Sequence, residues 1–87
     1  MRKPYQKILK NTFRDWLIHT REAAGITQSD MAQLLWMDDR SYADLEHGKS
    51  CCSALTLVIF LLFCCPDPNQ FLEELRHAFT AVPDKVA

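Results

Sequence analysis

Apolar residues recur along most of this 87-residue chain at spacings of three and four positions, which is the period of an amphipathic α-helix. The pattern divides into five segments, and capping residues, prolines and glycines mark where they end. No two alternating apolar runs are joined by an Asn-Gly or Asp-Gly turn, so there is no β-hairpin signal. The sequence therefore predicts an all-α protein of five helices.

The first predicted helix has two possible starting points. It begins at Thr12, where Asp15 completes a variant of the capping box, or earlier, near Pro4. Phe13 and the residues spaced three and four positions from it form its inward face. The helix is expected to end at Gly25, because glycine accepts the left-handed backbone of a helix C-terminus without steric penalty.

Two short helices are predicted next, each beginning with a capping side chain. Thr27 caps the second helix, and an acid three residues later lies near the positive end of the helix dipole. After a turn at Trp36, either Asp38 or Asp39 caps the third helix, which ends at Gly48. Two helices joined in this way form a helix-turn-helix, whose second helix can enter the major groove of DNA.

The fourth segment, residues 54–65, reads ALTLVIFLLFCC and carries no charge. A helix that is apolar on every side must be covered on most of its faces. Its length of about 18 Å is short of the roughly 30 Å hydrocarbon layer of a membrane. Burial inside the domain and against a partner subunit is therefore expected, and a membrane-spanning role is not.

The last predicted helix lies in the segment 66–82, where it starts at Asp67 and has Pro68 at its first position. Residues 83–87 are expected to form a frayed tail. The 87 residues make a single domain, too small for a deep enclosed active site. A composition with 48% hydrophobic and 24% charged residues is typical of a folded soluble protein.

The net charge is −1, but the ten basic residues are distributed unevenly. Half of them lie within residues 1–14, where there is no acid. Residues 1–11 are therefore predicted to be a basic arm or a basic extension of the first helix, which either pairs with phosphates or only keeps the chain soluble. No apolar stretch of an export signal follows this basic start, which favours the cytoplasm.

Four cysteines form two adjacent pairs, Cys51 with Cys52 and Cys64 with Cys65. A helix between the pairs would separate them by about 18 Å, whereas zinc holds its sulfur ligands at about 2.3 Å. Reduced thiols and no metal site are therefore expected. Three scattered histidines and two glycines offer neither a nucleophile–base pair nor a phosphate loop. We expect no enzyme activity, no cofactor and no small-molecule substrate.

Residues 12–65 resemble the lambda-repressor-like, Cro/XRE-type helix-turn-helix domains of bacterial and phage transcription regulators. The resemblance is carried by REAAGITQ at residues 21–28, by the spacing of Met31, Ala32 and Leu35, and by LEHGK at residues 45–49. It implies a sequence-specific DNA-binding regulator with its third helix in the major groove of double-stranded operator DNA.

The resemblance also implies roles for particular residues. Arg21 and Glu46 would form a structural ion pair between the first helix and the end of the third. Gln28 would contact a phosphate, and the Arg40 guanidinium is the best candidate for a guanine edge because it can bond two acceptors there. The full set of expected DNA contacts is Gln28, Asp39, Arg40, Ser41, Asp44 and Lys49.

Two features depart from the family pattern. Trp36 stands in the turn where the family usually has glycine, and it would be strained if the backbone there were left-handed. Residues 38–49 carry four acids against two basic residues, a net charge of −2 that lowers attraction to DNA. The alternative function is therefore a helix-turn-helix kept as a protein-interaction module, with the apolar fourth helix as its surface.

A homodimer is the second expectation, because a partner would cover the uncharged fourth segment. Pairing through the fourth and fifth helices could also place two reading helices about 34 Å apart, which is one turn of duplex. The candidate interface residues are Ile59, Phe60, Phe63, Phe71 and Leu75.

Overall fold

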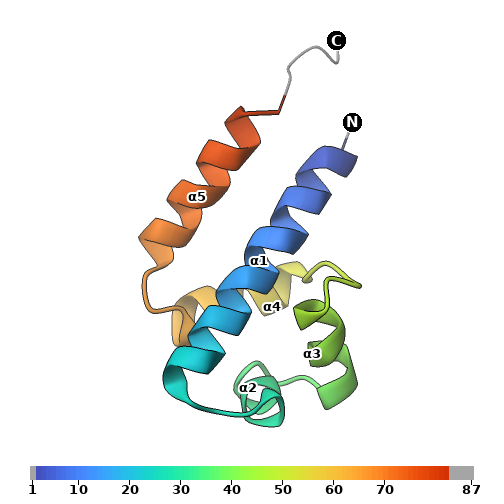
Figure 1. The fold of residues 1–87 in the computed structure, drawn as a ribbon, viewed down its shortest axis with the longest axis vertical. Helices are drawn as coiled ribbons and strands as arrows, with labels where there is room; N and C mark the ends of the chain where they lie inside the picture. The colour runs from blue at the N-terminus through green and yellow to red at the C-terminus, as the bar shows by residue number, and fades with distance from the viewer. Residues whose placement is uncertain (1, 83–87) are drawn as a thin grey trace.

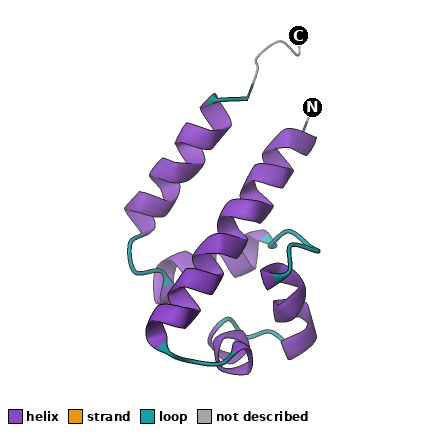
Figure 2. Ribbon diagram, in the orientation of Figure 1, coloured by secondary structure: helices purple, strands orange, loops and turns teal. Residues whose placement is uncertain are grey.

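The computed structural model describes residues 2–82, and every regular element in that range is helical (Figures 1 and 2). The elements are α1 (Lys3–Ala24), α2 (Gln28–Leu34), α3 (Asp39–Glu46), α4 (Ala54–Ile59), the π-helical turn η1 (Phe60–Cys64) and α5 (Pro68–Thr80). The predicted all-α class is confirmed. The tail predicted at residues 83–87 lies outside the described residues.

α1 spans 22 residues, begins near Pro4 and takes in the basic N-terminal run. The basic run is thus an extension of the first helix, because no glycine or proline interrupts residues 5–24. The predicted start at Thr12 is wrong, and the Asp15 carboxylate pairs with Arg14 instead of completing a cap. Gly25 ends the helix in a left-handed conformation with φ of 69°, as its position predicts.

α2 and α3 each begin at the cap that the sequence indicates. Thr27 Oγ1 accepts a hydrogen bond from the Asp30 backbone nitrogen at 3.1 Å, and the Asp30 carboxylate accepts from the Thr27 backbone nitrogen at 3.1 Å. At the next helix Asp38, and not Asp39, is the cap, because its Oδ1 accepts from the Ser41 backbone nitrogen at 2.7 Å. These capping bonds, which are reciprocal at α2 only, satisfy amide groups that a helix start leaves unpaired.

The turn between α2 and α3 holds Trp36 in the left-handed region, with φ of 58°. The indole does not fill a gap between helices, since 85% of the residue is exposed. A bulky L-residue in this conformation is destabilised by roughly 1–2 kcal/mol compared with its relaxed state. The turn therefore keeps the left-handed geometry that glycine would favour, although a tryptophan occupies the position.

The core is built from side chains of α1, α2, α3, η1 and α5, together with Leu35 at the end of α2. Its aromatic centre brings Phe13 and Phe60 within 5.2 Å, centroid to centroid, in an edge-to-face arrangement that suits the aromatic quadrupole. The buried apolar set is Phe13, Leu17, Met31, Ala32, Leu35, Tyr42, Leu45, Phe60 and Phe71.

α5 returns alongside α1 in the opposite direction, so the ends of both helices near the chain termini lie together at the top of Figure 1. Trp16 Nε1 donates to Glu74 Oε1 at 2.8 Å, and the rings of Tyr5 and Phe79 lie 4.9 Å apart. These contacts attach the last helix along much of the length of the first.

The rod formed by α4 and η1 is less covered than the sequence predicts. Phe60 is its one fully buried residue, while Leu62 is 70% and Phe63 is 78% exposed. An 87-residue chain has enough neighbouring surface to cover one stripe of this rod but not its whole circumference. In the range 2–82 no helix is both long and apolar enough to cross a lipid bilayer.

Candidate nucleic-acid interface

The carboxylate of Glu46, at the end of α3, connects the three N-terminal helices. It accepts hydrogen bonds from Arg21 Nε at 2.7 Å and Arg21 Nη2 at 3.2 Å. Gln28 Nε2 donates to it at 2.9 Å, and the Tyr42 hydroxyl also donates to it. Its side chain is 3% exposed, so α1, α2 and α3 meet at one buried and fully hydrogen-bonded carboxylate.

The surroundings of Glu46 keep it ionised. Burial alone would raise its pKa, but hydrogen bonds from Arg21, Tyr42 and Gln28 hold the pKa below its ordinary value. Burial and the adjacent Glu46 carboxylate raise the pKa of Tyr42, so the phenol stays protonated and donates. The two residues expected to form an ion pair are therefore in bidentate contact, a geometry that fixes orientation well.

Gln28 begins α2, and its amide faces into this network. Because its amide nitrogen donates to Glu46, the half-buried side chain links α2 to α3. The residue that the resemblance assigns to a phosphate contact thus has a structural role that the sequence did not indicate. The hydrogen bond from Ser29 Oγ to Asp39 Oδ1, at 3.2 Å, joins the first turns of the same two helices.

The outer surface of α3 is open to solvent. Asp39, Arg40 and Ser41 are exposed and Asp44 is half-buried, so the expected base-reading residues lie on or near the surface. Among residues 2–82, no acid forms an ion pair with Arg40. Its guanidinium is thus available to acceptors outside the chain.

The acids of α3 differ in how much charge they present. Asp38 accepts hydrogen bonds from the backbone nitrogen and hydroxyl of Ser41, and the backbone bond is the main cause of its lowered pKa. Glu46 is buried against Arg21, which neutralises it. Asp39 and Asp44 are therefore the acids of this helix that neither cap it nor form an ion pair with any residue from 2 to 82.

Four lysines surround an open hollow of about 340 Å³ beside the end of α3. Lys3, Lys7 and Lys10 come from one face of α1, where they are spaced four and three residues apart, and Lys49 follows α3. No acid occurs among the described residues that line this lysine hollow, and none pairs with these lysines in residues 2–82. The spacing on α1 was visible in the sequence, but the approach of Lys49 was not.

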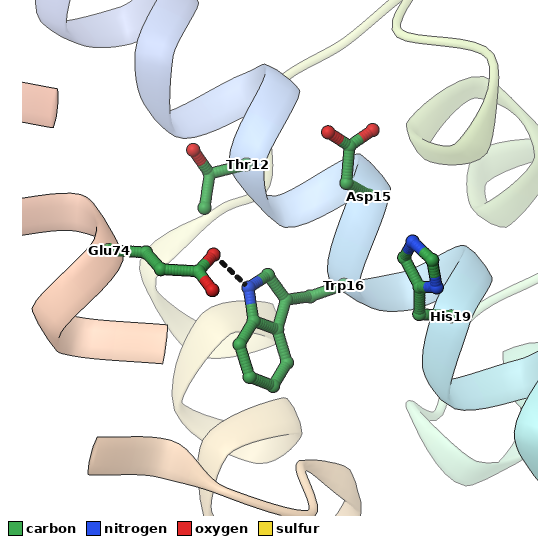
Figure 3. Close-up of a pocket in the computed structure, with 5 residues that line it drawn as sticks. All are labelled: Thr12, Asp15, Trp16, His19 and Glu74. Atoms are coloured by element: carbon green, nitrogen blue, oxygen red, sulfur yellow. Dashed lines mark hydrogen bonds between the residues drawn. The ribbon is translucent and has the colours of Figure 1, made fainter. Parts of the chain in front are cut away.

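A second groove, of about 400 Å³, lies where α1 faces α5 (Figure 3). It is lined by Thr12, Asp15, Trp16, His19 and Glu74. Its acids have partners within the chain, since Glu74 accepts from the Trp16 indole at 2.8 Å and Asp15 pairs with Arg14 at 3.0 Å. The hydrogen bond from Trp16 to Glu74 therefore attaches α5 to α1 across this groove.

The cysteines are all free thiols. Burial raises the pKa of Cys52 to about 12 and raises the pKa of Cys64 above its ordinary value, so both stay protonated and weakly nucleophilic. Within the part of the chain that the structure describes, no group of three or more His, Cys, Asp or Glu residues could hold a metal ion.

The structure divides the five candidate dimer residues into two groups. Phe63 is 78% exposed, while Ile59 and Leu75 are half-buried. Phe60 and Phe71 are 0% exposed, with ring centroids 6.1 Å apart in the core. These two are wrong as interface residues, because the inward stripes of η1 and α5 pack on each other inside the same chain.

No protein-family model, curated protein or solved structure matches this chain.

Proposed function

We propose that this protein is a sequence-specific DNA-binding transcriptional regulator with a lambda-repressor-like, Cro/XRE-type fold, and that α3 enters the major groove. The observation that carries the proposal is the exposed outer surface of α3, where Arg40 pairs with no acid of residues 2–82, on a helix that Glu46 anchors to α1. A helix fixed by a buried bidentate ion pair can present side chains to base edges in a constant orientation.

The charge distribution supports this orientation. Although the chain has a net charge of −1, the lysine hollow concentrates four positive charges at one side of α3. A phosphate backbone beside the groove would meet these lysines, and each neutralised phosphate would release counterions. Phosphate contacts of this kind set the register of a protein on the duplex, while base contacts determine sequence.

The side chains on α3 indicate which bases it would read. The Arg40 guanidinium can donate two hydrogen bonds to O6 and N7 of guanine, and Asp39 and Asp44 can accept from N4 of cytosine. Acids near phosphates weaken binding to random sequence, so affinity depends on a match at the bases. We therefore propose an operator that contains G·C pairs at the positions facing Arg40 and the two acids.

The test is selection of binding sites from a random duplex library, followed by fluorescence anisotropy at several salt concentrations. We expect a recovered site at which Arg40→Ala weakens binding by about 5- to 150-fold, because a good bidentate base contact contributes about 1–3 kcal/mol. The matched control is Arg76→Ala on α5, where Arg76 is 75% exposed and should not affect binding. A chain that enriches no sequence and binds no duplex at low salt would refute the proposal.

The alternative function, a protein-interaction module, is favoured by the exposed apolar residues of α4 and η1. A module of this kind would form a salt-insensitive complex with another protein and would give no gel shift with any selected duplex. The salt dependence of binding therefore distinguishes the two functions, because phosphate contacts weaken steeply with salt and apolar contacts do not.

A further inference from the structure

Large apolar side chains gather on the surface made by the end of α2, the Trp36 turn and the rod of α4 and η1. Trp36 is 85% exposed, Phe63 is 78% exposed and Leu34 is 52% exposed. Leu55 and Leu62, each 70% exposed, lie on the same rod with Val58, which is 48% exposed. We call this the α4 apolar face, and its members are Leu34, Trp36, Leu55, Val58, Ile59, Leu62 and Phe63. Monomeric soluble proteins rarely leave so many large apolar side chains together in water.

The conformation of Trp36 is a separate observation about this face. Its backbone is left-handed, with φ of 58°, at a position where glycine would be relaxed. The indole does not compensate by packing into the core, since 85% of the residue is exposed. A strained residue that points a large aromatic ring into solvent indicates a role outside the folding of the single chain.

The α4 apolar face contains both a protruding group and a hollow. Leu34, Trp36, Ile59 and Phe63 line a hollow of about 230 Å³. The same surface therefore offers an aromatic ring that can insert and an apolar depression that can receive one. Self-complementarity of this kind is what an isologous, two-fold symmetric interface requires.

Charge and area also favour a second copy as the occupant. Residues 50–66 contain no charged residue, so two copies would not repel each other across the rod of α4 and η1. The six most exposed residues of the face present on the order of 700 Å² of solvent-accessible surface per chain, which is close to the roughly 800 Å² that each partner buries in a standard interface. A smaller surface would support only a transient contact.

We infer that this chain forms a homodimer by pairing its α4 apolar face with the same face of a second copy, with Trp36 and Phe63 at the centre. Trp36 of each copy packs against the hollow between Ile59 and Phe63 of the other. The inference deepens the proposed function, on which it rests for its purpose, because paired chains can carry two α3 helices to two half-sites. Its test uses no DNA, so the two proposals can fail separately.

The experiment measures mass by sedimentation equilibrium across micromolar to millimolar concentrations of the full chain. A reducing agent is included because Cys51 is exposed and could form an intermolecular disulfide. We expect a monomer–dimer equilibrium for the unaltered chain. Phe63→Ser and Trp36→Gly should each weaken the dimer at least tenfold, while the control Leu72→Ser, which removes a 50% exposed leucine on α5, should leave it unchanged.

Trp36→Gly provides a second readout that a purely structural role would not give. Glycine relaxes the left-handed turn, so thermal unfolding of the dilute monomer should move to higher temperature while the dimer weakens. Opposite changes in monomer stability and dimer affinity support the inference. It is overturned by a chain that stays monomeric throughout, by an equal effect of Leu72→Ser, or by a face that binds only a different protein.

Discussion

The sharpest prediction for the fold concerns Arg21→Met, which removes the guanidinium but keeps most of the apolar stem. Glu46 would then lose two of its hydrogen bonds, at 2.7 and 3.2 Å, and its ion-pair partner, while its side chain is only 3% exposed. Leaving one charge of a buried pair uncompensated typically lowers the free energy of unfolding by about 3–5 kcal/mol. Because the Arg21 side chain is 18% exposed, water can partly replace it, and we expect about 3 kcal/mol.

That loss is large for a domain of this size. At roughly 0.05–0.15 kcal/mol per residue, the whole chain is expected to be stable by about 4–13 kcal/mol. Glu46→Gln should lower the free energy of unfolding by about 2 kcal/mol, because the neutral amide no longer supplies the negative charge with which the Arg21 donors pair. The double variant should lose about 1–3 kcal/mol less than the sum of the two single losses, since neither charge is left alone.

Urea unfolding followed by circular dichroism measures all three losses, with linear extrapolation to water. Arg14→Met is the matched control, because Arg14 pairs with the exposed Asp15 and should change stability by less than about 1 kcal/mol. The reasoning is refuted if Arg21→Met costs no more than this control. Strict additivity of the two single losses would also refute it, because the network would then not act through one carboxylate.

Two further predictions follow from the charges. Because the pKa of Glu46 is lowered in the folded chain, its stabilisation is complete above the ordinary carboxyl pKa and is lost as the pH falls through the lowered value. When the pH is lowered, thermal scans should therefore show a smaller loss of stability for Glu46→Gln than for the unaltered chain. Equal losses on acidification would contradict this. Replacing Lys7 and Lys10 by Gln should reduce the salt dependence of duplex binding by about 0.9 per phosphate contact removed, and an unchanged slope would mean that the lysine hollow faces away from DNA.

Local chemistry explains which parts of the fold could be predicted from the sequence. Thr27 and Asp38 are caps whose partners lie three residues away, so their role is written in a few neighbouring positions. Gly25 likewise needs only its own backbone freedom to end α1. Of the two starts that the sequence allows for α1, the one near Pro4 is correct and the one at Thr12 is wrong. Thr12 and Asp15 have the spacing of a cap, yet no glycine or proline between residues 5 and 24 breaks the helix.

Tertiary contacts explain what could not be predicted. Phe60 and Phe63 are the same residue type on one uncharged rod, and only packing against α1 and α5 determines that the first is buried and the second exposed. Their pattern could not reveal the π-helical turn, in which the Cys65 backbone nitrogen donates to the Phe60 carbonyl at 2.8 Å. Lys49 joins the other lysines only because α3 ends beside the extended part of α1.

The acids of α3 gain a function if α3 reads DNA. Asp39 and Asp44 would be repelled by phosphates whenever the helix lies in the wrong register or on the wrong sequence, whereas at a matched site each could accept a hydrogen bond from cytosine. Repulsion that acts mainly on incorrect complexes raises specificity, because specificity is a difference between two affinities. The lysine hollow would supply attraction common to both complexes. Substituting Asp44 by Asn should therefore strengthen binding to random duplex more than binding to the selected site.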